Sequence, residues 1–426
     1  MEGPRLEEVR LTSFKSFTGQ RLPLQDLTVL IGRNGSGKSN ALDALMVLAR
    51  LASGESVRDA LDGREDSVRG GVEGCAPLGE DSFEVGCRVR NGDAVFDLDV
   101  RIEVRPEVRV VREELVAVEG VAYGKRRLAG QTLLISGDRG ESIPGVLAVR
   151  YFNGRTRPAF ATDRLLISQV PLQMPLTTGS ARVVHEAART VLTALREVFL
   201  LDPVPHLMRS YVNERDSELR RSADNLSAVV ARLEETEPDA FHRLTDLVAG
   251  MPEYPVKGVG FVVTGLGDVQ LLLRESGYHG ADHDVPARLL SDGMLRFLAF
   301  GTAFLSSRRH LVIEEIENGL YPTQAARVLD LMKEETRRRR IDVLFTTHSP
   351  ALLNSLTADD HAGVIVCSRD PETGESLLTP LPELPGYVDL LAAGDLGDAV
   401  AKGRLPDAVR PRDTGSGSIE DFLRSL

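Results

Sequence analysis

The sequence contains few cysteines and no long hydrophobic run. Its three cysteines, Cys75, Cys87 and Cys367, are far apart and form no Cys-x-x-Cys pair. This scarcity argues against a disulfide framework or a zinc site and indicates a reducing, cytoplasmic setting. A membrane-spanning helix needs about 18 consecutive apolar residues, and the sequence has no such stretch. The first residues, Met-Glu-Gly-Pro-Arg, also lack the basic-then-apolar order of a secretory signal peptide.

The sequence also contains fewer basic residues than acidic residues. The chain of 426 residues carries 51 lysines and arginines against 63 acidic residues, a net charge of −12 at pH 7. Such a protein does not coat nucleic acid indiscriminately, although phosphate binding depends on where the charge lies. The densest basic run, residues 337–340, follows a predicted helix, and basic residues complement the dipole at a helix C-terminus. This position favours a solvated helix end over a DNA contact.

One octapeptide predicts a phosphate-binding loop. Residues 32–39 read Gly-Arg-Asn-Gly-Ser-Gly-Lys-Ser and fit the pattern G-x-x-x-x-G-K-[ST]. The apolar residues 27–31 predict a buried strand before it, and residues 40–51 predict a helix after it. We therefore expect bound ATP, with Lys38 near its β- and γ-phosphates and the Ser39 hydroxyl on Mg²⁺. The nucleotide-binding residues predicted here are Arg33, Asn34, Gly35, Ser36, Gly37, Lys38, Ser39 and Asn40.

A second motif supplies acidic chemistry. Residues 310–315 form an apolar run that ends in two carboxylates. Glu314 is placed to hold Mg²⁺, and Glu315 is placed to act as the general base for an attacking water. A strand followed by a surface acidic turn is the alternative interpretation. A further apolar strand that ends at His348 argues against that alternative.

A third motif lies between the first two. Ser291-Asp292-Gly293 precedes an apolar helix predicted over residues 295–305. By itself this is a weak signal, because serine is a common helix N-cap. It gains weight from its place in the order of phosphate loop, Leu-Ser-x-Gly, acidic strand and strand ending in histidine.

This order of motifs resembles ABC-type ATPases, and within them the RecF, structural-maintenance-of-chromosomes (SMC) and OLD-like branch. Four segments carry the resemblance: Leu11 to Phe17, Asn40 after the phosphate loop, the Glu-Asn-Gly turn at 317–319, and Thr346 to Pro350. The chain looks most like stand-alone bacterial AAA-family ATPases that are OLD-like. It has no Toprim-like acidic pair after residue 350, so a built-in nuclease is not expected.

The resemblance implies an α/β fold, namely a P-loop NTPase of the ABC type whose ATPase head is split by a compact helical insertion. It also implies a homodimer in which two heads sandwich ATP. Ser291 and Gly293 of one subunit would then cap the γ-phosphate held by the other subunit's Lys38, and His348 would contact that phosphate. Gln169 is the candidate for a glutamine that contacts Mg²⁺, although a surface glutamine before a proline turn is an equally good interpretation.

Four regions are predicted along the chain. Residues 1–179 form a first lobe, with Val-rich antiparallel strands over 83–89, 95–104 and 108–118. Residues 180–256 form the helical insertion, residues 257–400 the second lobe, and residues 401–426 a C-terminal tail.

The predicted function is ATP hydrolysis that cycles a dimer between closed and open states. By family analogy it serves DNA-related work, either genome maintenance or anti-phage defence, with duplex DNA as a candidate partner. One alternative is a sensor ATPase that gates a separately encoded nuclease or toxin. The other is the energising subunit of a transporter, which the Glu-Asn-Gly turn and the insertion argue against.

Overall fold

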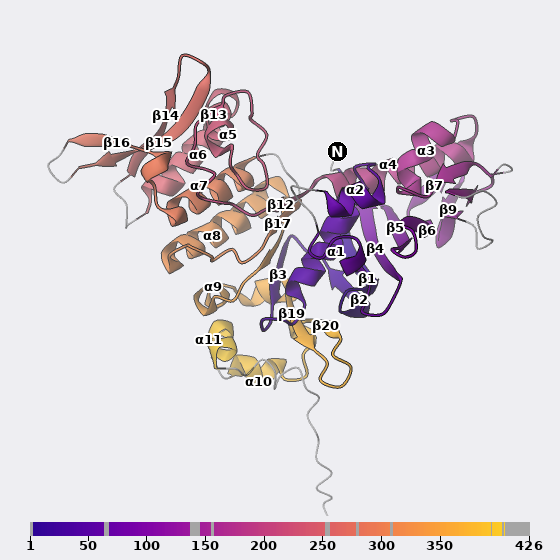
Figure 1. The fold of residues 1–426 in the computed structure, drawn as a ribbon. Helices are drawn as coiled ribbons and strands as arrows, with labels where there is room; N and C mark the ends of the chain where they lie inside the picture. The colour runs from indigo at the N-terminus through magenta and orange to yellow at the C-terminus, as the bar shows by residue number, and fades with distance from the viewer. Residues whose placement is uncertain are drawn as a thin grey trace, which may run out of the picture.

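The computed structural model describes residues 3–63, 68–136, 145–154, 157–251, 256–277, 281–306, 310–392, 394–402 and 404. Figure 1 shows an antiparallel lobe on one side, a helix-rich lobe on the other, and a central sheet between them. Within the described residues no helix is long and apolar enough to cross a membrane.

The central sheet has six strands in the order β12-β17-β18-β3-β19-β20. Their bounds are β3 Leu27–Ile31, β12 Val198–Leu201, β17 His310–Ile313, β18 Asp342–Thr346, β19 Val364–Arg369 and β20 Ser376–Pro380. All neighbours pair in parallel except β19 and β20. Ligands of such sheets bind where the carboxyl ends of the strands meet. The residues after β3, β17 and β18 therefore share one edge.

Helices cover both faces of this sheet. Helix α1 (Lys38–Leu51) lies on one face, and α7 (Asp292–Leu305) and α8 (Pro322–Arg339) lie on the other. Leu30 of β3 packs in the core that contains α1, while its neighbours Val29 and Ile31 pack in the core that contains α7 and α8. Burial on both faces explains why β3 reads as a continuous apolar run.

The second large sheet is antiparallel and has the order β11-β10-β9-β6-β5-β4-β1-β2. Its strands are β1 Arg5–Phe14, β2 Phe17–Pro23, β4 Ser82–Asn91, β5 Ala94–Glu103, β6 Arg109–Glu119, β9 Gln131–Ser136, β10 Val146–Tyr151 and β11 Ala159–Ala161. The three strands predicted in the first lobe are confirmed as β4, β5 and β6. Asn91 pairs with Ala94, so the predicted hairpin joins β4 to β5.

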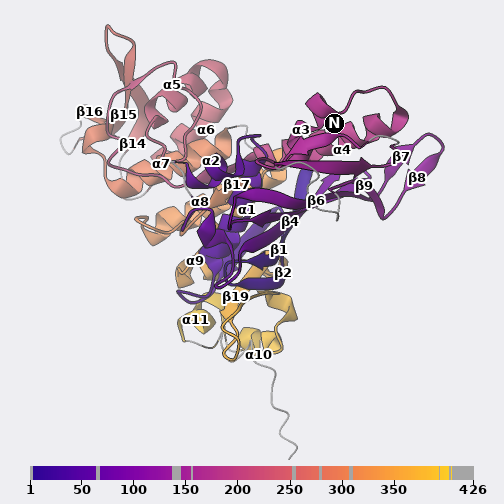
Figure 2. The ribbon, with the colours of Figure 1, turned by 45° about the vertical axis from the view of Figure 1, so that its right-hand side comes forward.

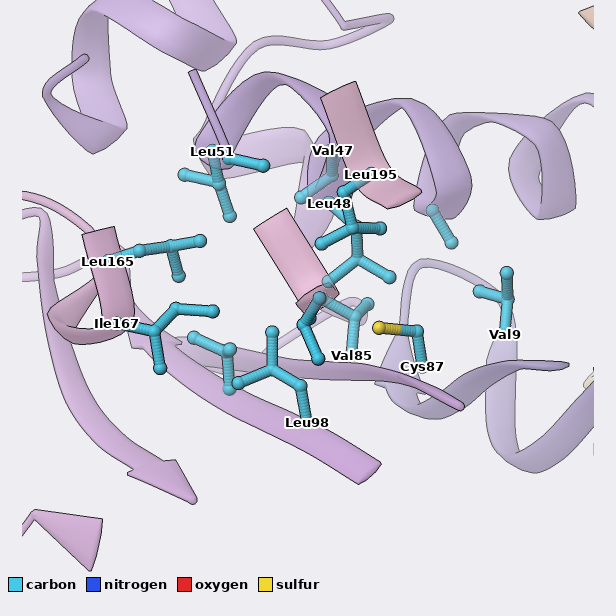
Figure 3. Packing of buried hydrophobic residues seen from close by; sticks show 14 of the residues in the cluster. Val9, Val47, Leu48, Leu51, Val85, Cys87, Leu98, Leu165, Ile167 and Leu195 are labelled. Carbon is cyan, nitrogen blue, oxygen red and sulfur yellow. The ribbon is translucent and has the colours of Figure 1, made fainter. Parts of the chain in front are cut away.

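Helix α1 bridges the two sheets. Figure 3 shows Val47, Leu48 and Leu51 of α1 above Val85 and Leu98 of the antiparallel sheet. All five side chains are fully buried. The helix that follows the phosphate loop is therefore held in place by packing against the antiparallel sheet of the first lobe.

The predicted helical insertion has different boundaries in the structure. Helix α4 (Gly179–Arg196) packs its apolar face into the first-lobe core. Strand β12 joins the central sheet beside β17. Val198 to Leu201 is a four-residue apolar run, which periodicity alone cannot distinguish from the end of a helix. The prediction that the insertion starts at residue 180 is therefore wrong.

The helices outside the two sheets are α5 (Leu226–Thr236) and α6 (Pro238–Ala249). They pack in the core of α7 and α8, against a small sheet. That sheet contains β13 Val212–Asn213, β14 Val256–Val263, β15 Asp268–Ser276 and β16 Asp282–Pro286. Figure 2 shows this sheet and the antiparallel sheet at different ends of the molecule.

The remaining α-helices and strands of the described chain are short. They are α2 Val57–Asp62, α3 Leu166–Gln173, α9 Pro350–Asn354, α10 Tyr387–Ala392, α11 Leu396–Ala401, β7 Val121–Tyr123 and β8 Arg126–Leu128. Of the predicted tail over 401–426, only residues 401, 402 and 404 lie within the described residues.

Candidate nucleotide-binding site

The predicted phosphate loop connects β3 to α1, as the sequence indicates. Gly35 and Gly37 have φ of +77° and +116°, a backbone region that favours glycine. A Cβ at Gly37 would also lie 2.4 Å from Ser376 Oγ. Because Gly37 is the N-cap of α1 and has no side chain, the first N–H groups of this helix can face an anion.

Strands β19 and β20 support the loop from behind. Ser376 Oγ donates a hydrogen bond of 2.6 Å to the Ser36 carbonyl, and Cys367 Sγ donates to the same carbonyl at 3.3 Å. Arg369 Nε donates to the Gly35 carbonyl at 3.0 Å. Since these carbonyls are bound on the far side, the loop's N–H groups can point toward a ligand. Burial raises the pKa of the Cys367 thiol, so this sulfur stays protonated as a donor.

The Lys38 side chain lies folded against its own loop. Its Nζ donates to the carbonyls of Gly32 (2.8 Å) and Arg33 (3.2 Å), and the residue is only 8% exposed. Burial lowers the pKa of Lys38. A desolvated ammonium with two weak acceptors is well placed to exchange them for phosphate oxygens.

The Asn40 side chain makes contacts that the sequence did not indicate. Its Nδ2 donates to Ser16 Oγ at 2.9 Å, and Ser16 Oγ is 2.7 Å from Ser376 Oγ. The amide therefore ties α1 to the turn between β1 and β2 and to β20. Its side chain supports the phosphate loop, and its role in nucleotide binding stays a prediction.

Glu314 follows β17 directly and contacts the phosphate loop. Ser39 Oγ donates to Glu314 Oε1 at 2.5 Å. Arg69 donates to the same oxygen at 3.1 Å, and its other terminal nitrogen bonds Oε2. Burial opposes ionisation of this carboxyl, but the Arg69 and Ser39 hydrogen bonds outweigh it and hold the pKa of Glu314 below its usual range.

Sequence reasoning missed Arg69 entirely. The residue lies in the loop between α2 and β4, and nothing in its spacing relates it to Glu314, 245 positions away. Its only sequence signal is a basic residue directly before the pair Gly70-Gly71.

Glu315 adopts an unusual backbone conformation. Its φ is +48°, in the left-handed region, which costs a non-glycine residue of order 1–3 kcal/mol. Its N–H donates to Thr346 Oγ1 at 2.8 Å, and Thr346 is buried. Its carboxylate accepts from Asn318 Nδ2 at 2.5 Å. The local fold thus determines the position of this carboxylate from both its backbone and its side chain.

His348 lies two residues beyond β18, at the same edge of the sheet. Its backbone N–H donates to Glu317 Oε1 at 2.5 Å. Burial is the main cause that lowers the pKa of His348, and the charge of Lys38 lowers it further. Glu317 and Glu315 act in the opposite direction. His348 therefore lies close enough to Lys38 and Glu315 to interact with their charges.

Ser291 and Gly293 begin α7 on the opposite face of the central sheet from α1. Ser291 is the N-cap, and its Oγ accepts from the Met294 N–H at 3.2 Å. A Cβ at Gly293 would lie 2.5 Å from the Gly319 carbonyl oxygen, so glycine permits α7 to approach the turn at 317–319. Asp292 is exposed and pairs with Arg209 at 2.6 Å.

The prediction that Gln169 contacts Mg²⁺ is wrong. Its Oε1 accepts from the Ala161 N–H at 2.9 Å, and its Nε2 donates to the carbonyls of Ala161 (2.9 Å) and Leu165 (3.3 Å). The amide therefore joins α3 to β11. Figure 1 shows α3 at the outer end of the antiparallel lobe, well away from β3.

The remaining polar groups fit a magnesium ion. Mg²⁺ prefers oxygen ligands and is commonly held by one or two protein oxygens together with nucleotide phosphates. The Ser39 hydroxyl and the Glu314 carboxylate supply such oxygens in direct contact with each other. Among the described residues, no group of three or more His, Cys, Asp or Glu side chains could hold a metal by itself.

A phosphate loop after β3, a carboxylate pair after β17 and a histidine after β18 lie at one edge of a largely parallel sheet. With the antiparallel lobe beneath α1, they define a P-loop ATPase of the ABC type. The family profile "AAA domain, putative AbiEii toxin, Type IV TA system" matches residues 27–171 and 194–354, well over half of the chain. The chain belongs to this family.

Two short stretches of the chain are similar to parts of chromosome-associated proteins. Over 75 residues the chain is 35% identical to the structural maintenance of chromosomes protein 1 of Arabidopsis thaliana, covering 16% of this chain and 6% of that protein. Over 55 residues it is 47% identical to the chromosome partition protein Smc of a Synechococcus strain, covering 12% and 5%. The chain therefore matches only about one-twentieth of the length of these relatives.

A comparison with solved structures finds SMC heads among the similar chains. One is the SmcHead bound to the C-winged helix domain of ScpA, with 14% identity, a TM-score of 0.49, and coverage of 88% of this chain and 97% of that chain. Another is the SMC head domain from Thermotoga maritima, with 13% identity, a TM-score of 0.42, and coverage of 88% and 98%.

Proposed function

We propose that this protein binds ATP with Mg²⁺ and hydrolyses it, and that the reaction cycles two copies of the chain between an ATP-closed and an open dimer. One observation carries the proposal. The phosphate loop, the Ser39–Glu314 contact and the Glu315 carboxylate converge at a single edge of the central sheet.

The chemistry follows from the positions of these groups. The loop N–H groups and the α1 dipole bind the triphosphate, and Lys38 exchanges its two carbonyl acceptors for phosphate oxygens. Ser39 and Glu314 would hold a magnesium ion, which would supply charge neutralisation on the phosphates. Glu315 accepts a proton from the attacking water, and His348 contacts the γ-phosphate end.

A second copy of the chain would complete the site. Ser291 and Gly293 lie at the start of a 14-residue helix, where backbone N–H groups favour an anion such as a γ-phosphate. Leu289 and Tyr321, which flank this helix start and the turn at 317–319, are 68% and 61% exposed. These exposed side chains beside the start of α7 support the proposal that a second copy covers this surface.

The biological setting is proposed to be DNA-related work in the cytoplasm. The partial similarity to chromosome proteins supports genome maintenance with duplex DNA as a partner. The free cysteines Cys75, Cys87 and Cys367 support a reducing compartment. The second candidate is a sensor ATPase that gates a separately encoded nuclease or toxin. The family description, which names a toxin–antitoxin system, supports that candidate.

Three measurements on the full chain test these statements. Phosphate release should require both ATP and Mg²⁺, and sedimentation should show an ATP-dependent increase in mass. Duplex DNA should bind at low salt, more tightly with a non-hydrolysable ATP analogue than without nucleotide. A chain that releases no phosphate would contradict the ATPase. A chain that hydrolyses ATP but binds no DNA under either condition would favour the toxin-gating function.

A further inference from the structure

The guanidinium of Arg69 donates hydrogen bonds to both carboxylate oxygens of Glu314. One terminal nitrogen donates to Oε1 at 3.1 Å, and the other bonds Oε2. Ser39 Oγ donates to the same Oε1. We infer that Arg69 is the built-in counter-ion of Glu314 and competes with Mg²⁺ for it, so that binding of Mg²⁺–ATP must displace the guanidinium. This inference rests on the proposed function.

The backbone around Arg69 is anchored to the site. Lys15 Nζ donates to the Arg69 carbonyl at 2.8 Å and pairs with Asp43 of α1 at 2.7 Å. A few residues further on, the Val72 N–H donates to Asp62 Oδ1 at 2.7 Å. The carbonyl of Arg69 is therefore held relative to the helix that follows the phosphate loop, and the movable part is its side chain.

The competition follows from the atoms involved. A magnesium ion at this site uses the Ser39 oxygen and reaches a Glu314 oxygen directly or through water. Arg69 donates to both Glu314 oxygens, and one of them already accepts from Ser39. A guanidinium and a divalent cation cannot both neutralise this one carboxylate at contact distance without repelling each other. The Arg69 side chain is 53% exposed, so it can leave for solvent without becoming buried and unpaired.

The expected size of the effect is modest. An ion pair with this exposure contributes little stabilising free energy by itself. A bidentate arginine–carboxylate pair lies at the upper end of the range for such pairs. The informative quantity is a ratio: the dissociation constant of ATP measured in EDTA, divided by the dissociation constant measured in saturating Mg²⁺. In Arg69→Ala we expect this ratio to rise about three- to tenfold over the natural chain, because Mg²⁺–ATP no longer has to break the ion pair.

Two further variants keep the test specific. Arg127 lies on β8, is 72% exposed and is 3.7 Å from Asp93, so Arg127→Ala removes the same charge far from Glu314. That control should leave the ratio unchanged. In a Glu314→Gln background the carboxylate is gone, and adding Arg69→Ala should then have no effect on the ratio.

Each outcome has a definite meaning. An increase in Arg69→Ala that disappears in the Glu314→Gln background supports the inference. An unchanged or lower ratio in Arg69→Ala overturns it, and the proposed function stands provided that the natural chain binds ATP with Mg²⁺. An increase that persists in the Glu314→Gln background also overturns it. If the natural chain binds no ATP in saturating Mg²⁺, the inference and the proposed function both fail.

Discussion

Two helix N-termini in this protein carry glycine-containing motifs, and their surroundings differ. The N-cap of helix α1 is Gly37, which has no side chain to bond the first N–H groups. Helix α7 starts at Ser291, whose own hydroxyl accepts from the Met294 N–H. Asp292, in the first turn of α7, is in turn paired with Arg209. The first terminus leaves its donors to a ligand, whereas the second satisfies part of its donors within the chain.

The difference predicts different roles for the two helix ends. A triphosphate needs several N–H donors and a cation, and the α1 terminus offers these with Lys38. The α7 terminus offers an exposed serine and fewer open donors, which suits a second contact on a phosphate that is already bound. We therefore expect changes at the α1 end to affect binding, and changes at the α7 end to affect association of two copies.

The largest effect is expected for Lys38→Ala. A bound triphosphate loses its charge-assisted contact, and ATP affinity should fall by about a thousandfold. Titration with a fluorescent ATP analogue measures this directly. Lys257→Ala is the matched control, because Lys257 is 52% exposed and pairs with Asp282 on the small sheet. Equal affinities in the two variants would show that the loop is not the phosphate site.

The next effect concerns hydrolysis alone. Glu315→Gln keeps the shape of the side chain but cannot accept the water's proton, so phosphate release should fall by about a hundredfold. ATP affinity should stay within a few-fold, because Lys38, Ser39 and Glu314 are intact. Glu372→Gln, at an exposed position, serves as the control. Unimpaired phosphate release in Glu315→Gln would assign the general base to another group.

The α7 end is tested in the same background. Glu315→Gln should trap ATP and hold two copies together, which sedimentation detects as a stable dimer. Adding Ser291→Arg places bulk at the proposed contact and should weaken the dimer by about tenfold or more. A dimer that ignores Ser291→Arg would contradict the role of α7, and a persistent monomer in Glu315→Gln would contradict the dimer cycle itself.

The smallest effect is expected at Thr346. Thr346→Val removes the hydroxyl that accepts the Glu315 N–H and should lower the turnover rate about three- to tenfold, with ATP affinity unchanged. Thr346→Ser keeps the hydroxyl and should restore most of the rate. If the serine variant is as slow as the valine variant, the hydroxyl does not position Glu315.

Local sequence predicted the parts of the site that lie on short, ordered motifs. Lys38 and Ser39 lie at the start of α1, Glu314 directly follows β17, and His348 lies two residues beyond β18. The sequence pattern of each of these elements is clear, and parallel strands bring their carboxyl ends to one edge. The central sheet order and the position of α4 depend on pairing between distant segments. An apolar run such as residues 198–201 does not specify its neighbour.

The remaining site residues were not predictable for a related reason. Arg69 and Ser376 act through contacts with residues hundreds of positions away in the chain, and their own neighbours in sequence carry no motif. Gln169 was misassigned because a buried glutamine that bonds to backbone and one that binds a metal look alike in sequence. The side-chain partner of Asn40 was not predictable either, since Ser16 lies in a turn that precedes the phosphate loop.

The support of the phosphate loop by β19 and β20 has a consequence for biosynthesis. The loop is translated within the first tenth of the chain, yet its carbonyls are bound by Cys367, Arg369 and Ser376, and its strand β3 lies between β18 and β19. A ribosome must therefore complete most of the polypeptide before the loop has its final shape. A nascent or prematurely ended chain would therefore carry the whole motif without the side chains that hold its carbonyls in the finished molecule.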